Sequence, residues 1–174
     1  WSPEHETDKA IEYLSEKRDK SKPFALYMSW NPPHSVYSEV PEEYMKLYDE
    51  VKLKSNVCLD SIHHHTGEEA GMTEEEMTLT TKQYFAAISG LDKQFGRIID
   101  YLKENDLYDD TLVILSADHG DMMGSHGLMG KHVWYEESIR IPFVVHVPGN
   151  DNRRCSTCIG SQDMMPTILG LLNC

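Results

Sequence analysis

The chain has 174 residues, of which 16 are Lys or Arg and 29 are Asp or Glu, so its formal net charge is −13. Its apolar content of 40% and charged content of 26% are ordinary for a globular protein and allow one α/β domain with a sizeable core. The acidic surplus argues against nucleic acid or an anionic membrane as partner, and no apolar run is long enough to predict a membrane span.

The first third of the chain alternates helical and extended patterns. Charge and apolar spacing predict a helix over Lys9–Lys20, and a short apolar run with aromatics predicts a buried strand over Phe24–Trp30. The sequence Asn-Pro-Pro-His34 ends that strand abruptly. A short helix is expected over Pro41–Tyr48, because proline suits a first helical turn.

The stretch Leu53–Met72 shows no periodicity, and we expect it to be a surface excursion. It contains the run His63-His64-His65. Three adjacent histidines in an extended segment cannot direct all their side chains at one ion, so a solvated loop is favoured over a metal site.

A long helix is predicted next. Thr73 and Glu76 have the spacing of a capping box, and the helix is expected to continue to about Asn105. Apolar residues recur along it at steps of three and four, which predicts one buried face. These residues are Tyr84, Ala87, Ile88, Leu91, Phe95, Ile98, Ile99 and Leu102.

The C-terminal part predicts three strands and a helix. The strands are Thr111–Leu115, Pro142–Val147 and a short one over Cys155–Ile159, and the helix begins at Ser161 with Pro166 in or near its first turn. Strands alternating with helices predict an α/β fold with a mostly parallel sheet flanked by helices on both faces. With no repeat or linker, the chain reads as one domain or part of one.

The four cysteines do not suggest a disulfide scaffold. Cys155 and Cys158 form a Cys-x-x-Cys pair, but a zinc site needs a second pair, and Cys58 and Cys174 stand singly. Redox pairs tend to open a helix, whereas this pair lies in a strand-like stretch. A structural or incidental role is therefore favoured.

The most informative stretch runs from Ser116 to Pro142. Asp118 and His119 follow the end of a predicted buried strand, where α/β proteins place their sites. A carboxylate and an imidazole at that rigid position can ligate a metal. The alternative is an aspartate that caps the following turn beside a bystander histidine.

Lys131 follows a loop rich in glycine, which allows the backbone to fold back over the strand tip. An ammonium there can neutralise a tetrahedral oxyanion. The alternative is a solvated lysine, or one paired with Glu136 or Glu137.

His34 also follows a strand end, and the two prolines before it hold its position. It can act as a general acid or as a donor that anchors substrate, or it is a loop histidine without a role. His126 and the pair Met122-Met123 are expected to pack within the loop.

Taken together, these segments resemble the sulfatase family of the alkaline phosphatase superfamily over nearly the whole chain. The most specific piece is Asp-His-Gly120 with Gly-Lys131 and the following Tyr-Glu-Glu-Ser-Ile-Arg-Ile-Pro142. The other segments that carry the resemblance are Phe24–His34, Pro41–Tyr48, Tyr84–Leu102 and Asp163–Leu169.

The resemblance implies an alkaline phosphatase-like fold and roles for four residues. Asp118 and His119 would be two ligands of a divalent cation, usually Ca²⁺ in sulfatases. Lys131 would contact the sulfate oxygens, and His34 would lie near the bridging oxygen and help the alcohol depart. The substrate would be a sulfated small molecule or carbohydrate, and a periplasmic, secreted or lysosomal location is favoured; the oligomeric state stays open.

Two family features have no match in the chain. The nucleophile motif Cys/Ser-x-Pro-x-Arg, whose cysteine becomes formylglycine, is missing, and so is the early Asp-Asp metal pair, for which Asp109-Asp110 before a strand is no substitute. We therefore expect residues 1–174 to be the second half of a sulfatase catalytic domain, with formylglycine in the other half, and to be inactive alone. A phosphonate or phosphate ester hydrolase of the same superfamily, or a non-catalytic anion-binding protein, are the alternatives.

Overall fold

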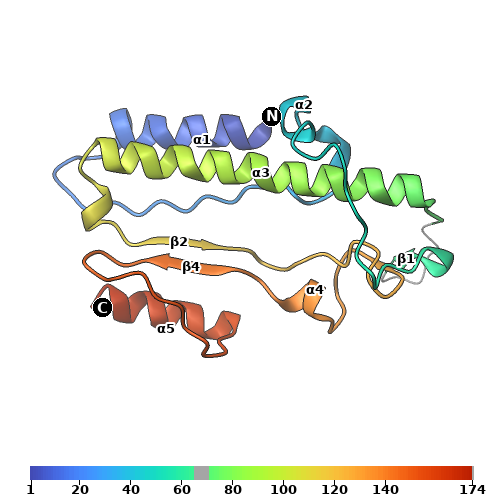
Figure 1. The fold of residues 1–174 in the computed structure, drawn as a ribbon. Coiled ribbons are helices and arrows are strands. Elements are labelled where there is room, and N and C mark those ends of the chain that lie inside the picture. Colours follow the sequence, from blue (N-terminus) through green and yellow to red (C-terminus); the bar gives the residue numbers. More distant parts are fainter. Residues whose placement is uncertain (65–70, 174) are drawn as a thin grey trace.

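The computed structural model describes residues 1–64 and 71–173. Two long helices pack side by side on top of the molecule, α1 (Ser2–Glu12) and α3 (Glu74–Glu104), as Figure 1 shows. A π-helical turn, Tyr13–Lys17, continues α1. The helix predicted over Lys9–Lys20 is confirmed as far as Lys17, where the chain becomes extended at Arg18. It begins earlier than expected, and Pro3 suits its first turn, where a missing amide hydrogen costs nothing.

The predicted capping box of α3 is present. The amide of Glu76 donates to Thr73 Oγ1 at 3.2 Å, and the amide of Thr73 donates to Glu76 Oε2 at 2.8 Å. The predicted buried face is confirmed at Ala87, Ile98 and Leu102, whereas Ile88 is 42% exposed. Ile98 and Leu102 form a core cluster with Ala10 and Leu14 of the first helical segment.

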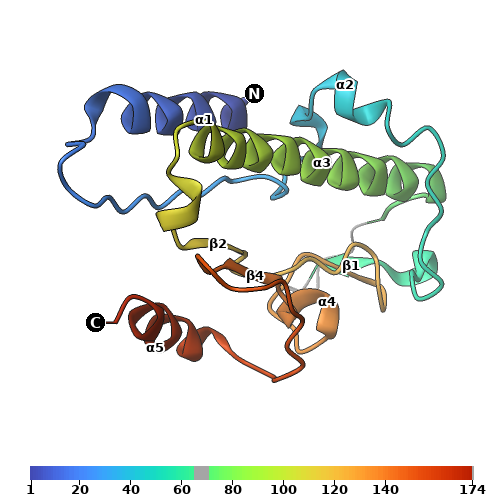
Figure 2. The same cartoon turned by 60° about the vertical axis from the view of Figure 1, so that its left-hand side comes forward.

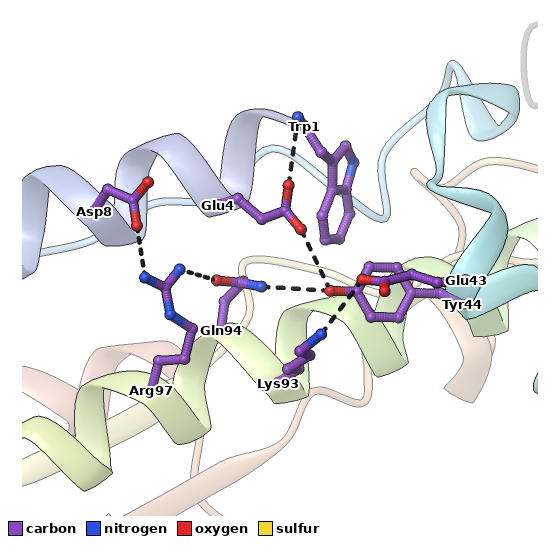
Figure 3. A network of polar contacts seen from close by, with 8 residues as sticks. All are labelled: Trp1, Glu4, Asp8, Glu43, Tyr44, Lys93, Gln94 and Arg97. Atoms are coloured by element: carbon purple, nitrogen blue, oxygen red, sulfur yellow. Dashed lines mark hydrogen bonds and ion pairs between the residues drawn. The ribbon is translucent and has the colours of Figure 1, made fainter.

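A polar network joins the helices at the other end of this contact (Figure 3). The buried amide of Gln94 accepts from Arg97 Nη1 at 2.8 Å and donates to the hydroxyl of Tyr44 at 3.5 Å. Arg97 also donates to Asp8 of α1 at 2.6 Å, and Tyr44 belongs to the short helix α2 (Glu42–Met45). Both α1 and α2 are thereby fixed on α3.

The sheet differs from the prediction. Strand β2 (Val113–Ser116) pairs with β4 (Phe143–His146) in antiparallel register, and β1 (His63–His64) pairs with β3 (Leu128–Met129) in parallel. A mostly parallel sheet is thus not found among the described residues. In both views α3, with α1 beyond it, lies on one side of the β2–β4 pair, and α5 (Ser161–Leu171) lies on the other (Figures 1 and 2).

Two of the predicted strands do not form in the described part of the chain. Phe24–Trp30 is extended, and Phe24 and Met28 pack on the cluster formed by α1 and α3, but none of the strand pairs in the described chain includes this segment. The predicted burial is also wrong for most of the segment, since Phe24, Met28 and Trp30 are only partly buried and Tyr27 is 91% exposed. A strand needs a hydrogen-bonded neighbour, which the apolar pattern alone does not supply. Cys155–Ile159 is likewise without strand structure.

The expected surface excursion over Leu53–Met72 is wrong for its middle part. Ile62 is 2% exposed within a second core cluster that includes Met77, Met123 and Met129, and the next two histidines form β1. This segment packs on the loop before Lys131, so its apolar residues are buried by tertiary contacts that carry no local period. His65 lies outside the described residues.

Candidate active site

The fold brings His34 and Lys131 together although they are 97 residues apart in sequence. Lys131 Nζ lies 2.8 Å from His34 Nε2. Lys131 comes two residues after β3, and His34 follows the extended segment that ends at Trp30. The alternative partners expected for the lysine are engaged elsewhere, since Glu136 contacts Arg140 and Glu137 accepts from Asn56.

The main chain sets which nitrogen His34 offers. Its Nδ1 lies 2.9 Å from the carbonyl oxygen of Ser35 and 3.3 Å from the Ser35 hydroxyl, and because a carbonyl can only accept, the shorter contact favours the tautomer with the proton on Nδ1. Nε2 then holds a lone pair, which accepts from the ammonium of Lys131. Any further proton taken up by this ring must go to Nε2, on the side of the lysine.

Asp118 and His119 also converge, just beyond the end of β2. Asp118 Oδ1 accepts from the amide of His119 at 2.9 Å, and Asp118 Oδ2 lies 3.4 Å from His119 Nε2. His119 Nδ1 lies 2.7 Å from the carbonyl oxygen of Gly120, so this ring too presents an unprotonated Nε2. An oxygen and a nitrogen lone pair therefore meet at one place.

This pair can supply two ligands of a cation site. The Asp118 side chain is 86% exposed, and a carboxylate oxygen with a neutral imidazole nitrogen can bind one divalent ion. No group of three or more His, Cys, Asp or Glu residues with metal-site geometry occurs in the described part of the chain. Further ligands would have to come from other residues.

The loop between the two pairs folds back as its glycines predict. Gly124 and Gly127 have φ angles of +79° and +71°, which side chains disfavour. The amide of Met122 donates to the carbonyl of Gly130 at 2.7 Å and closes the loop. His126 stacks on Tyr135 with ring centroids 4.1 Å apart, and Met122 is fully buried, which agrees with the expected packing roles.

Sequence reasoning missed one side chain at this site, Asp121. Its Oδ1 accepts from the amides of Met123 and Gly130 at 3.0 and 3.2 Å, and its Oδ2 accepts from the hydroxyl of Tyr37 at 2.9 Å. Burial, followed by the nearby Asp121 carboxylate, raises the pKa of Tyr84 to about 12 and also raises the pKa of Tyr37. The carboxylate that accepts from the amide two residues later forms an Asx-turn, and an aspartate at the start of a glycine-rich loop is the sequence signal for it.

The Cys-x-x-Cys pair takes no part in these contacts. Cys155 and Cys158 are exposed free thiols, and Cys155 Sγ lies 3.3 Å from Thr157 Oγ1. Hydrogen bonding with Thr157 lowers the pKa of the Cys155 thiol. Among the residues that the structure describes, no helix has both the length and the apolar composition needed to cross a membrane.

Comparison with known proteins identifies relatives along the whole chain. The family model described as Sulfatase matches residues 2–174. A protein of Bacteroides thetaiotaomicron named endo-4-O-sulfatase is 36% identical over 98% of this chain and 34% of its own length. The chain thus spans about a third of the length of the curated relatives that it matches.

Solved structures agree with this placement. The crystal structure of a putative sulfatase yidJ from Bacteroides fragilis superimposes with a TM-score of 0.82 at 36% identity, over 98% of this chain and 36% of that one. A phosphonate monoester hydrolase of Agrobacterium radiobacter superimposes with a TM-score of 0.68 at 27% identity, over 83% of this chain and 32% of that one. The neighbours share the alkaline phosphatase-like fold, of which this chain is a part.

Proposed function

Because this chain belongs to the sulfatase family, we propose that the full-length protein hydrolyses an organic sulfate ester and that residues 1–174 form the second half of its catalytic domain. The observation that carries the proposal is the 2.8 Å contact between Lys131 Nζ and His34 Nε2. This contact brings an ammonium and an imidazole together, which supports assigning a cation and a proton donor to the sulfate ester.

Lys131 is assigned to the sulfate group. An ammonium has three donors, and only one is used on His34, so the others can bind sulfate oxygens. Fixed donors of this kind stabilise the charge that develops in the transition state and need little reorganisation.

His34 is assigned to the leaving oxygen. Its Nδ1 proton is held by the carbonyl of Ser35, so the ring can take up a second proton only at Nε2, and Lys131 then turns its donor from Nε2 to the bound ester. From there the ring can donate to the departing alkoxide, whose charge grows as the S–O bond breaks.

Asp118 and His119 are assigned to a divalent cation, Ca²⁺ by family resemblance, through Oδ2 and Nε2. When bound, such an ion supplies Lewis-acid polarisation of the ester oxygens and spreads their charge. Calcium takes about 6–8 ligands, so the remaining ligands and a formylglycine nucleophile are assigned to the rest of the protein. The 174-residue chain by itself is therefore expected to be inactive.

The proposed substrate is an O-sulfate ester of a carbohydrate or small molecule. The relative named endo-4-O-sulfatase supports an O-linked sulfate. We place the protein in the periplasm, a lysosome or the secreted fraction on the same family grounds. A phosphonate monoester is the second candidate substrate, since the likeness to a phosphonate monoester hydrolase extends over most of this chain.

The test compares initial rates of the full-length protein, with calcium, on p-nitrophenyl sulfate, p-nitrophenyl phosphate and a phosphonate monoester. We expect the sulfate rate to dominate and to fall about 10²–10³-fold in Lys131→Ala and in His34→Ala. Lys93→Ala, which removes an exposed lysine paired with Glu43, is the matched control and should leave the rate unchanged. A dominant phosphorus-ester rate would refute the sulfate assignment, and no turnover of any ester would favour a non-catalytic protein.

A further inference from the structure

We propose that Asp121 is a positioning residue that fixes the distance between Lys131 and His34; the inference rests on the proposed function of that pair. Asp121 is assigned neither to the sulfate ester nor to the cation. Its carboxylate, however, contacts both loops that deliver the two side chains, and each of its oxygens serves a different loop.

The first oxygen holds the lysine loop. Asp121 Oδ1 accepts from the amides of Met123 and Gly130, and Gly130 directly precedes Lys131. Gly130 has a φ of +80°, so its amide and carbonyl point where an ordinary residue would not direct them easily. The carboxylate therefore sets the direction in which the backbone enters Lys131.

The second oxygen holds the histidine loop. Asp121 Oδ2 accepts from the hydroxyl of Tyr37, which lies three residues after His34. The Tyr37 ring packs edge-on against Tyr84 of α3, with centroids 6.1 Å apart, so the phenol is itself braced by the long helix. A hydrogen bond to a carboxylate is stronger and shorter than a neutral one, which suits a fixed link.

The consequence is a rigid connection that runs from α3 through Tyr37 and Asp121 to Gly130. Lys131 and His34 carry flexible or exposed side chains, and their 2.8 Å contact alone would not hold two loops in register. A misplacement of about 1 Å in such a pair can cost about 10²-fold in rate. Asp121 acts on the reaction only through the two residues that it aligns.

Tyr37→Phe in the full-length protein tests the link without removing the carboxylate. We expect kcat/KM to fall by about 10–100-fold. Tyr48→Phe is the matched control, because it removes another interelement phenol hydrogen bond, to Ser89 at 2.7 Å, away from the site. An equal loss of rate in Tyr48→Phe would overturn the proposal, since general loss of packing would then explain both.

Asp121→Asn and Asp121→Ala test the carboxylate itself. An amide can accept from both main-chain groups and donate to the Tyr37 oxygen, so Asp121→Asn should retain activity within about tenfold of the unmodified protein. Asp121→Ala loses all three contacts and should be no more active than Tyr37→Phe. Asparagine as damaging as alanine would overturn the positioning role.

A double-mutant cycle separates positioning from stability. In a His34→Ala background there is no longer a pair to align, so adding Tyr37→Phe should cost less than about threefold. If Tyr37→Phe costs the same factor in both backgrounds, it does not act through His34 and the proposal fails.

A crystal structure of full-length Tyr37→Phe gives a readout independent of substrate. We expect the separation between Lys131 Nζ and His34 Nε2 to exceed hydrogen-bonding distance. Retention of the 2.8 Å contact would overturn the inference even in an active sulfatase. Conversely, an enzyme that cleaves only phosphorus esters would refute the proposed function, while this separation and the same cycle on that ester would still decide the role of Asp121.

Discussion

Gly120→Ala tests whether the loop that follows β2 must pack closely against the short helix after Lys131. A methyl group at position 120 would overlap the carbonyl oxygen of Glu137, which is main chain and cannot rotate away. The amide of Gly120 donates to the carbonyl of Ser138 at 2.8 Å, so moving the loop away from the helix also breaks a hydrogen bond. Glu137 and Ser138 both belong to α4 (Glu136–Ile139).

The magnitude follows from these two losses. Forcing an extra carbon into a packed site costs about 1–3 kcal/mol, and losing one hydrogen bond adds about 1 kcal/mol. We therefore expect the free energy of unfolding to fall by about 2–4 kcal/mol. The carbonyl of Gly120 also holds His119 Nδ1, so its displacement should weaken divalent-cation affinity by about 10–100-fold.

Urea unfolding of the full-length protein and calcium titration of its activity would measure the two effects. Gly96→Ala is the matched control, because a methyl group there meets nothing within 4 Å and alanine favours a helix by about 1 kcal/mol. Gly120→Ala that unfolds like the unmodified protein and binds calcium as tightly would refute the reasoning.

Three further predictions concern other parts of the fold. Gln94→Ala should lower the free energy of unfolding by about 1–3 kcal/mol, because the side chain is 1% exposed and bonded to Arg97 and Tyr44; urea unfolding measures it. Asp118→Asn should weaken calcium binding by at least about tenfold, read by calorimetry of the full-length protein, and unchanged affinity would exclude this ligand. Hydrogen bonds from Thr73 lower the pKa of Glu76 below its ordinary 4.5, so stabilisation of the first turn of α3 should be complete above that value and lost as the pH falls through the lowered pKa. Amide exchange in that turn should lose this pH dependence in Glu76→Gln and only weaken it in Thr73→Val, which removes the hydroxyl but keeps the main-chain amide that bonds Glu76.

Much of the helical part could be predicted from sequence, whereas the roles of the four candidate site residues stay predictions. Capping signals and three- and four-residue periods are local, so the long helix is found within a residue of its predicted end at Asn105. His34, Lys131, Asp118 and His119 each follow an extended segment, and the structure brings them together in two pairs.

The sheet could not be predicted, because pairing depends on neighbours that the local pattern does not encode. Phe24 and Met28 pack on the helices, yet the segment that contains them joins none of the described strand pairs. The local sequence around Ile62 predicts exposure, because its burial comes from contacts with the distant Met77 and Met129. Asp121 was missed for the same reason, since its partner Tyr37 is 84 residues away.

The hydrogen bonds from Nδ1 of His34 and His119 have a consequence for how this site can vary. Nδ1 of each ring contacts the carbonyl oxygen of the next residue, so the main chain favours one tautomer of each ring. At His34 the Ser35 hydroxyl also lies 3.3 Å from Nδ1, so this side chain adds to the main-chain contact, whereas at His119 the next residue is a glycine without a side chain. A substitution that keeps the main-chain path should therefore keep the tautomer of both imidazoles. Other neighbouring side chains can then change which substrates the site admits.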